Sequence, residues 1–228
     1  AKIKIADNTY EYRFAKNGQS FDFIPGQYVG LSFTKLIKPD PAGNIKCFSL
    51  TSVPSDPHIG IVLRQSDSGL KTTLDSLKLG EPAIIEGPYG QFTLHADQNK
   101  PAVFIVGGIG IAPVLSIIND LLAKNVNRDI TIFFSNKNRA VAPYFEYFQK
   151  LTTHPSFKLI FNLTEPESDW AGISGRLNQE MLQKYVPDIH VPVYYLVGKP
   201  DMVYQIYELL ESLGIPDENI KTESFAGY

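Results

Sequence analysis

The sequence predicts two domains, an antiparallel β-sandwich or small β-barrel over residues 1–97 and a doubly wound α/β domain over residues 98–228. In the first part, short runs of β-branched and aromatic residues recur between Gly, Pro, Asn and Asp, a pattern typical of all-β domains. In the second part, apolar runs of strand length alternate with amphipathic runs of helix length. This alternation predicts right-handed crossovers and a parallel sheet. A chain of 228 residues is long enough for both domains.

The first domain contains strand-like segments and one helical segment. The apolar spacing at positions 70, 74, 77 and 79 predicts a short helix over Leu70–Leu79. Turn signals such as Asn17-Gly18 and Pro25-Gly26 separate the strands. We place the domain boundary in the polar link His95–Pro101. The strands are expected at residues 3–5, 10–14, 28–33, 47–51, 59–64 and 82–86.

The second domain alternates between strands and helices. Its first strand, Ala102–Val106, is uninterrupted in its apolar character, as expected of a strand buried on both faces. The further strands are expected at residues 130–134, 157–162, 193–197 and 220–225, and the helices at residues 112–124, 144–151, 178–185 and 202–213.

Composition narrows the classes of protein to consider. The charged side chains sum to 21 − 24 = −3, so the chain as a whole does not attract nucleic acid. The single cysteine, Cys47, cannot form an internal disulfide or supply an iron–sulfur cluster, and a reducing compartment is the expected environment. The longest uncharged stretch, residues 101–119, is interrupted by Gly and Pro and is not expected to span a membrane.

A glycine-rich turn opens the second domain. Gly107, Gly108 and Gly110 follow the first strand, and Pro113 lies early in the next helix. Glycines allow a ligand to approach the backbone, and the positive helix end favours a phosphate or diphosphate. The turn lacks the Gly-Lys-Ser/Thr of a P-loop and the Gly-x-Gly-x-x-Gly of a Rossmann fingerprint. The alternative is a tight strand–helix junction without a ligand.

A second turn of this kind, Gly198–Met202, follows the strand at residues 193–197. If the two strands are neighbours in the sheet, both turns lie at the carboxyl edge and form one crevice.

Four further segments complete the pattern: Pro25–Tyr28, Lys46–Ser52, Glu86–Phe92 and Glu223–Phe225. In order with the two glycine turns, they resemble the ferredoxin–NADP⁺ reductase superfamily, in particular compact bacterial flavin reductases and oxygenase reductases without an iron–sulfur domain. The resemblance covers essentially the whole chain. It implies an antiparallel β-barrel domain that binds FAD, followed by a doubly wound parallel-sheet domain that binds NADPH or NADH.

The resemblance implies a set of flavin-binding residues in the barrel. Four residues match the family's Arg-x-Tyr-Ser motif: Lys46, Cys47, Phe48 and Ser49. Lys46 would place a positive charge at the flavin diphosphate and Phe48 an aromatic face at the cofactor, while Ser49 would bind the flavin N5 edge. The family's phosphate-binding helix start matches Gly69 with either Thr72 or Thr73. Arg64 would add a second positive charge, or is a solvated arginine at a strand end.

The resemblance also implies residues that bind the nicotinamide coenzyme. They are Gly107, Gly108, Gly110 and Pro113 in the first turn and Gly198, Lys199 and Met202 in the second. Ile109 stands where the family often has Thr, and Val197 where it usually has Cys. After the second strand of the domain come Ser135, Lys137 and Arg139, which suit a 2′-phosphate and favour NADPH. The alternative for these three residues is a solvated basic loop.

Residues near the C-terminus are expected to act at the flavin. The resemblance implies that Phe225 or the terminal Tyr228 covers the flavin ring and moves aside for the nicotinamide. Glu223 would relay a proton, or would only cap a strand end. With Ser49, these three residues form the predicted catalytic set.

The sequence therefore predicts an FAD-dependent NAD(P)H oxidoreductase that passes hydride from NAD(P)H to FAD. The electrons would continue to a separate acceptor, namely a ferredoxin-type iron–sulfur protein, a haem protein or free flavin. One alternative is a flavin-binding electron-transfer subunit of a larger complex, without its own NAD(P)H turnover. Another is a non-enzymatic binding module. We expect a cytoplasmic protein, a monomer or weak dimer, with no metal site and no nucleic-acid partner.

Overall fold

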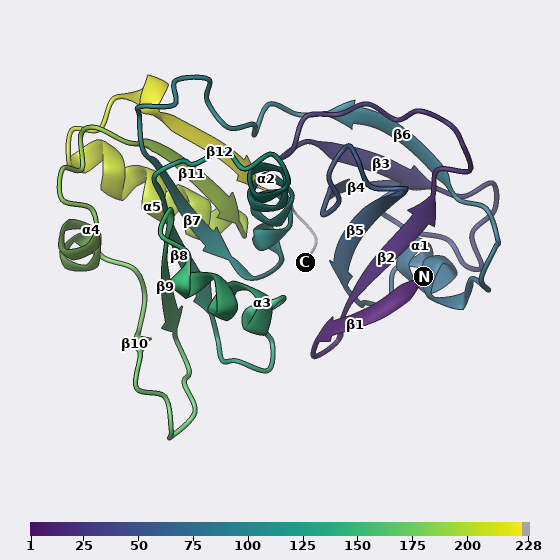
Figure 1. Cartoon of the computed structure of the whole chain (residues 1–228). Coiled ribbons are helices and arrows are strands. Elements are labelled where there is room, and N and C mark those ends of the chain that lie inside the picture. The colour runs from purple at the N-terminus through teal and green to yellow at the C-terminus, as the bar shows by residue number, and fades with distance from the viewer. Residues whose placement is uncertain (225–228) are drawn as a thin grey trace.

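The computed structural model describes residues 1–224. It contains a β domain and an α/β domain side by side, with α2 (Ile111–Ala123) next to the β domain (Figure 1). The predicted site residues Phe225 and Tyr228 lie outside the described residues.

The N-terminal domain consists of two antiparallel sheets, with strand orders β1-β2-β5 and β4-β3-β6. An isolated bridge between Leu50 and Ile61 connects the two sheets. This arrangement confirms the predicted antiparallel β domain. Its elements are β1 (Lys2–Ala6), β2 (Thr9–Ala15), β3 (Tyr28–Ser32), β4 (Ile45–Ser49), β5 (His58–Arg64), α1 (Gly69–Ser76) and β6 (Ile84–Tyr89).

The core of this domain follows from the alternation along its strands. Val29 and Leu31 on β3 point inward and are fully buried. They pack in one cluster with Leu70 and Leu74, the apolar stripe of α1. The helix begins after Ser68, whose hydroxyl accepts a hydrogen bond from the Lys71 amide. It ends at residue 76, earlier than the predicted residue 79, because the backbone at Leu77 is already extended.

The C-terminal domain is built on a six-stranded parallel sheet in the order β10-β9-β8-β7-β11-β12. This sheet confirms the predicted doubly wound architecture; the two-residue strand β10 was not predicted. The strands are β7 (Ala102–Gly107), β8 (Ile130–Asn136), β9 (Phe157–Leu163), β10 (Ile173–Ser174), β11 (Val193–Gly198) and β12 (Ile220–Ser224). Besides α2, the helices are α3 (Phe145–Lys150), α4 (Gln179–Tyr185), α5 (Pro200–Ser212) and the 3₁₀ turns η1 (Gly108–Gly110), η2 (Leu151–Thr153) and η3 (Asp217–Asn219).

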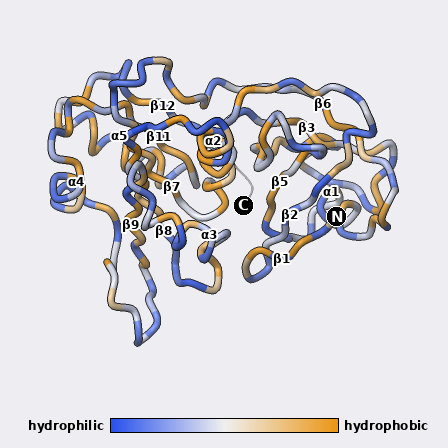
Figure 2. Tube along the Cα trace, in the orientation of Figure 1, coloured by the Kyte–Doolittle hydropathy of each residue, from blue (hydrophilic) through white to orange (hydrophobic). Residues whose placement is uncertain are grey.

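Strand β7 is buried on both faces, as its continuous apolar run predicts. Phe104 and Val106 pack in the cluster that contains the apolar residues of α2, whereas Val103 and Ile105 pack with residues of α4 and α5. Figure 2 shows hydrophobic residues along the sheet strands and α2, with polar residues concentrated in the outer loops. The sheet therefore positions its carboxyl edge rigidly between two helical layers.

The connection between the domains is fixed by side chains. Phe92 lies in the core of the C-terminal domain, and the backbone amide of His95 donates a hydrogen bond of 2.8 Å to the Tyr195 hydroxyl on β11. On the outer side of the barrel, Val62 packs against Ile109 and Ala112 of the first glycine turn and α2. The division after residue 97 stays a prediction, and residues ahead of it already contact the second domain.

His95 gives a pH-dependent contribution to stability. Burial lowers the pKa of its imidazole below the usual value, and the charges of Arg128, Lys221 and Lys100 lower it further, against a raising effect of the Lys100 carbonyl. The folded state thus favours neutral His95. Its contribution is present above the unfolded pKa of about 6.5 and is lost as the pH falls.

We expect protonation of His95 to lower the free energy of unfolding by about 1 kcal/mol or less as the pH falls from 7 to 5. The free energy of unfolding is measured by urea denaturation at several pH values. His95→Gln should remove this part of its pH dependence, whereas His190→Gln, at an exposed position, should leave the pH dependence unchanged. An identical slope in both variants would show that His95 does not titrate in this way.

Candidate functional site

The two glycine turns meet at the carboxyl edge of the sheet. β7 and β11 are neighbouring parallel strands, with Val106 in register with Val197. A Cβ atom at Gly107 would lie 2.4 Å from the Met202 sulfur, and one at Gly110 would lie 2.6 Å from the Val197 carbonyl oxygen. Only glycine fits at Gly110, where main-chain atoms are in the way, whereas at Gly107 the Met202 side chain would have to move. Strand β8 flanks β7 on its other side, so the turns lie where the connections diverge to opposite sides, the usual ligand position of such sheets.

The first turn leaves space for a ligand. Gly108 has a left-handed backbone, with φ of +54°, and no atom of residues 1–224 lies within 4 Å of a Cβ built there. No side chain caps the start of α2, whose first turn includes the buried Pro113. The open space at Gly108 and the uncapped start of α2 together fit a diphosphate. Ile109, in the place of the family's Thr, is instead buried against the barrel.

Ser49 and Glu223 are brought together across the domain boundary. The Ser49 hydroxyl on β4 donates a hydrogen bond of 3.1 Å to Oε2 of Glu223 on β12. Burial raises the pKa of the Glu223 carboxyl to about 7, and the hydrogen bond from Ser49 opposes this shift. The pair can therefore hold or release a proton near neutral pH.

The charge of the Glu223 carboxylate affects the pKa of two neighbouring side chains. Burial raises the pKa of the Cys47 thiol, and the charge of Glu223 raises it further. Burial also raises the pKa of Tyr28, with smaller effects of Cys47 and Glu223. Phe48, next in the motif, is largely enclosed in the barrel core.

Lys46 lies in a charged cluster at the start of α1. Its ammonium is 3.2 Å from Oδ1 of Asp40, whose side chain is only 2% exposed. Oδ2 of Asp40 accepts a hydrogen bond of 3.0 Å from the Leu70 amide, and this bond contributes most to lowering the pKa of the carboxyl to about 2. Sequence reasoning missed Asp40, because it lies in a loop 30 positions from Leu70 and no motif contains it.

Two further cations surround this cluster. The buried Lys71 donates a hydrogen bond of 2.8 Å to the Arg64 carbonyl, and its pKa is lowered by burial and then by the charges of Lys46 and Arg64. Among the atoms of residues 1–224, Nε of Arg64 is buried without a hydrogen-bond partner. Three cations with one carboxylate give a net charge of 3 − 1 = +2. This surplus and the orphaned Arg64 donor fit the diphosphate of a flavin dinucleotide.

The predicted phosphate-binding helix start is engaged within the protein. A Cβ at Gly69 would lie 2.3 Å from the Lys38 carbonyl oxygen, so a loop covers this position. The Thr73 hydroxyl donates to the Gly69 carbonyl and accepts a hydrogen bond from the Ile37 amide. Thr72 is half-buried beside them. The roles of these residues in binding phosphate stay predictions.

Of the three predicted coenzyme residues that follow Gly107 in the next strand–turn unit, Ser135 lies within β8 and is in register with Gly107 of the first glycine turn. The Ser135 hydroxyl accepts a hydrogen bond of 3.0 Å from the Asn162 amide. Lys137 and Arg139 follow, and each forms an ion pair with acidic residues of the segment after β9. Sequence reasoning missed these acidic partners, because only the order of the strands brings the two segments together.

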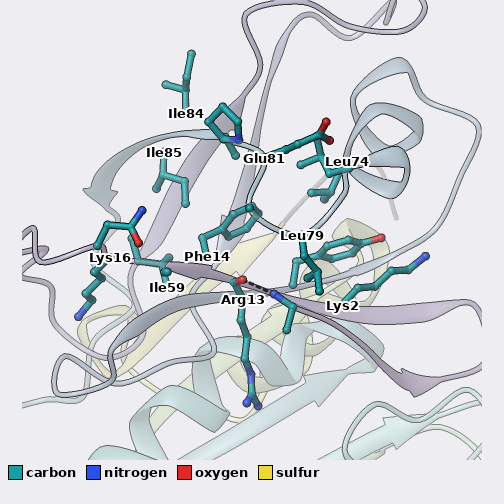
Figure 3. Close-up of a pocket in the computed structure, with 18 of the residues that line it drawn as sticks. Lys2, Arg13, Phe14, Lys16, Ile59, Leu74, Leu79, Glu81, Ile84 and Ile85 are labelled. Carbon is teal, nitrogen blue, oxygen red and sulfur yellow. Dashed lines mark hydrogen bonds between the residues drawn. The ribbon is translucent and has the colours of Figure 1, made fainter.

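A cavity of about 670 Å³ lies elsewhere, at the end of the β domain near the N-terminus. Figure 3 shows Phe14, Leu74 and Ile85 around it, while Arg13 directs its side chain away. None of the predicted site residues that lie within residues 1–224 lines this cavity. The predicted site residues instead gather where the two domains meet, around the Ser49–Glu223 pair and the two glycine turns, and we refer to this region as the crevice.

The family model of the oxidoreductase NAD-binding domain matches residues 104–207. The phenol hydroxylase P5 protein of Acinetobacter pittii is 30% identical over 212 residues, which cover 90% of this chain and 58% of that protein. One component of the Na⁺-translocating NADH-quinone reductase of Yersinia pestis is 33% identical over 159 residues, 67% of this chain and 39% of that protein. The chain thus spans less than two thirds of the length of these relatives.

Solved structures share the complete fold. The flavohem-like FAD/NAD-binding domain of nitric oxide dioxygenase from Vibrio cholerae has a TM-score of 0.84 at 18% identity, covering 100% of this chain and 96% of that one. The ferredoxin–NADP⁺ reductase of Plasmodium falciparum has a TM-score of 0.75 at 19% identity, covering 99% and 94%. The Amycolatopsis cytochrome P450 reductase GcoB has a TM-score of 0.83 at 23% identity, covering 100% and 68%.

The fold, the paired glycine turns and the family model define an oxidoreductase with an NAD-binding domain. Together with the relatives and structures, they support the ferredoxin–NADP⁺ reductase superfamily for this chain. The predicted family and fold class are confirmed, and the predicted cofactor class, FAD with NAD(P)H, is confirmed at the level of the superfamily. Within residues 1–224, no helix combines the length and apolarity that crossing a bilayer requires.

Proposed function

We propose that this chain is an FAD-dependent NAD(P)H reductase that passes electrons to a separate acceptor. The observation that carries the proposal is a continuous path of contacts between the two predicted binding sites. Gly110 touches the Val197 carbonyl, Val197 is in register with Glu223, and Glu223 accepts the hydrogen bond from Ser49. These contacts support a common site that is bordered by the glycine turns and the flavin motif.

Each group of residues has a role in this proposal. The two glycine turns and the start of α2 bind the diphosphate of the nicotinamide coenzyme, and Lys46, Arg64 and Lys71 bind that of the flavin. Ser49 and Glu223 hold a proton between Oγ and Oε2 at the edge of the flavin site. When bound, FAD supplies the redox chemistry, accepting two electrons as hydride and releasing them as a pair or singly.

Anaerobic spectroscopy tests this function. The purified chain is loaded with FAD, separated from free flavin, and mixed without oxygen with NADH or NADPH; ferricyanide then serves as acceptor in a steady-state assay. We expect the visible absorbance of the bound flavin to bleach and ferricyanide to be reduced. Colour that persists with both coenzymes would instead support a flavin-binding electron-transfer subunit. A chain that takes up no flavin would contradict both readings.

Asp40→Asn is expected to raise the affinity for flavin while it lowers the stability of the protein. The substitution removes the carboxylate that competes with a diphosphate for Lys46, so FAD should bind several-fold more tightly at low salt. The flavin-free protein should lose about 1–3 kcal/mol in urea denaturation, because charged hydrogen bonds to Leu70 and Ala42 are weakened.

The control for this variant is Asp67→Asn, which removes an exposed carboxylate paired with Lys38 beside the same helix start. This variant should change the affinity for FAD and the free energy of unfolding only slightly. Weaker FAD binding by Asp40→Asn than by the control would show that Asp40 supports the flavin rather than competing with it.

A further inference from the structure

We propose that the crevice selects NADH over NADPH through three carboxylates, Glu165, Glu167 and Asp169. The inference rests on the proposed function, because it assigns a specificity to the same coenzyme site. It differs from the sequence-based preference for NADPH, which considered only the basic residues after β8.

The segment that should contact the adenosine ribose is fixed by the sheet. In open α/β sheets the residues after the second strand reach the ribose of a dinucleotide bound at the first turn. Here that strand is β8, which pairs with β7 up to Gly107 and Ser135. Residues 137–139 follow directly. The group at the 2′ position of the ribose is therefore recognised by this segment and whatever lies against it.

Lys137 is held by the segment that follows β9. Its ammonium lies 3.1 Å from Oε1 of Glu165. The Glu165 amide also donates a backbone hydrogen bond of 2.7 Å to the Lys137 carbonyl, and the Thr164 amide donates one of 2.9 Å to Asn136. The two segments run side by side, so Glu165 stays next to Lys137 even when the ion pair itself opens.

Arg139 is engaged by two carboxylates. Oε1 of Glu167 accepts a hydrogen bond of 2.9 Å from the Arg139 backbone amide, and Oε2 lies 3.4 Å from Nε. Asp169 pairs with the same guanidinium group. The guanidinium also lies over the Trp170 ring, 5.8 Å from its centroid. The hydrogen bond from its own backbone amide lowers the pKa of Glu167, and the Arg139 amide and guanidinium lower it further. The hydrogen bond with Arg139 lowers the pKa of Asp169, so both carboxyls remain ionised at neutral pH.

The charge of this cluster disfavours a 2′-phosphate. Two cations and three carboxylates give 2 − 3 = −1, and a phosphate monoester carries about −1.5 to −2 at pH 7. Binding the phosphate through Lys137 or Arg139 would release a carboxylate within a few ångströms of it. A ribose 2′-hydroxyl, by contrast, can donate a hydrogen bond to a carboxylate, as in NAD-specific sites. The same residues thus attract NADH and repel NADPH.

The test compares both coenzymes and two flavin-independent probes. We expect kcat/KM of the FAD-loaded chain to favour NADH by at least about tenfold at low salt, and less as the ionic strength rises. In calorimetry, 5′-AMP should bind more tightly than adenosine 2′,5′-bisphosphate. Glu165→Gln alone, and the triple variant with Glu167→Gln and Asp169→Asn, should narrow or invert both preferences.

A matched control is Asp120→Asn, which removes the carboxylate of an exposed ion pair with Lys124 on α2. This variant should leave unchanged both the preference for NADH over NADPH in kcat/KM and the preference for 5′-AMP over the bisphosphate in binding. A wild-type preference for NADPH and the bisphosphate, or preferences that the single and triple variants leave unaltered, would overturn the inference. Loss of the proposed function gives a different result, namely no flavin reduction by either coenzyme while 5′-AMP still binds with the expected preference.

Discussion

Gly110→Ala is expected to disable the coenzyme site while the local backbone stays allowed. The backbone at Gly110 is right-handed helical, with φ of −56°, so alanine is not strained there. Its Cβ, however, would lie 2.6 Å from the Val197 carbonyl oxygen and 2.9 Å from the carbonyl carbon. These are backbone atoms of a central strand and cannot rotate away. The first turn and β11 must separate, and the crevice between them changes shape.

We expect KM for the coenzyme to rise at least about tenfold, since small displacements of a positioned ligand have large effects. The free energy of unfolding should fall by about 1–3 kcal/mol, as in other overpacked sites. Both are measured on one preparation, by steady-state kinetics and urea denaturation. Gly18→Ala is the matched control: φ there is +80°, no atom lies within 4 Å, and only stability should change. Unaltered KM in Gly110→Ala would show that the ligand does not use this turn.

The sequence predicts this fold well where local pattern decides the structure. The apolar run of β7 requires burial on both faces, and the structure provides two helical layers. The prediction errors occur where the structure depends on neighbouring segments rather than on the local sequence. β10 has only two residues, Ile173 and Ser174, and exists because β9 offers an edge. The end of α1 was placed too late, because the apolar Leu79 continues the helical spacing but is 87% exposed.

The candidate site shows the same division. Motifs single out the glycine turns, Ser49 and Glu223, because each motif residue is tied to its own strand end, but only the structure shows that Ser49 and Glu223 contact each other. Charges cannot be assigned in this way. Lys137 and Arg139 look like a free basic loop in the sequence, yet β9 brings an acidic segment against them. Net charge at a site depends on which strands are neighbours, and this information is not contained in any one segment.

Glu223→Gln is expected to lower the rate of electron passage about 10²-fold, the lower end of the usual effect of a general acid or base. The variant keeps the shape of the side chain and can still accept the hydrogen bond from Ser49, but cannot exchange a proton. The wild-type rate should change with an apparent pKa near 7, because burial raises the pKa of this carboxyl to about 7. The variant should lack that inflection. Ser49→Ala should lower the rate as well but keep an inflection at a shifted pH.

Stability provides a second readout that does not involve turnover. The folded pKa of Glu223 lies above the unfolded value of about 4.5, so the folded state favours the protonated form. Its contribution is fully present below pH 4.5 and is lost as the pH rises through 7, opposite in direction to that of His95. Glu223→Gln should therefore be more stable than wild type at pH 8, by about 1–3 kcal/mol, and similar at pH 5. Equal stability at both pH values, with the kinetic inflection retained, would exclude Glu223 as the titrating group and would leave Ser49 without a proton partner at the crevice.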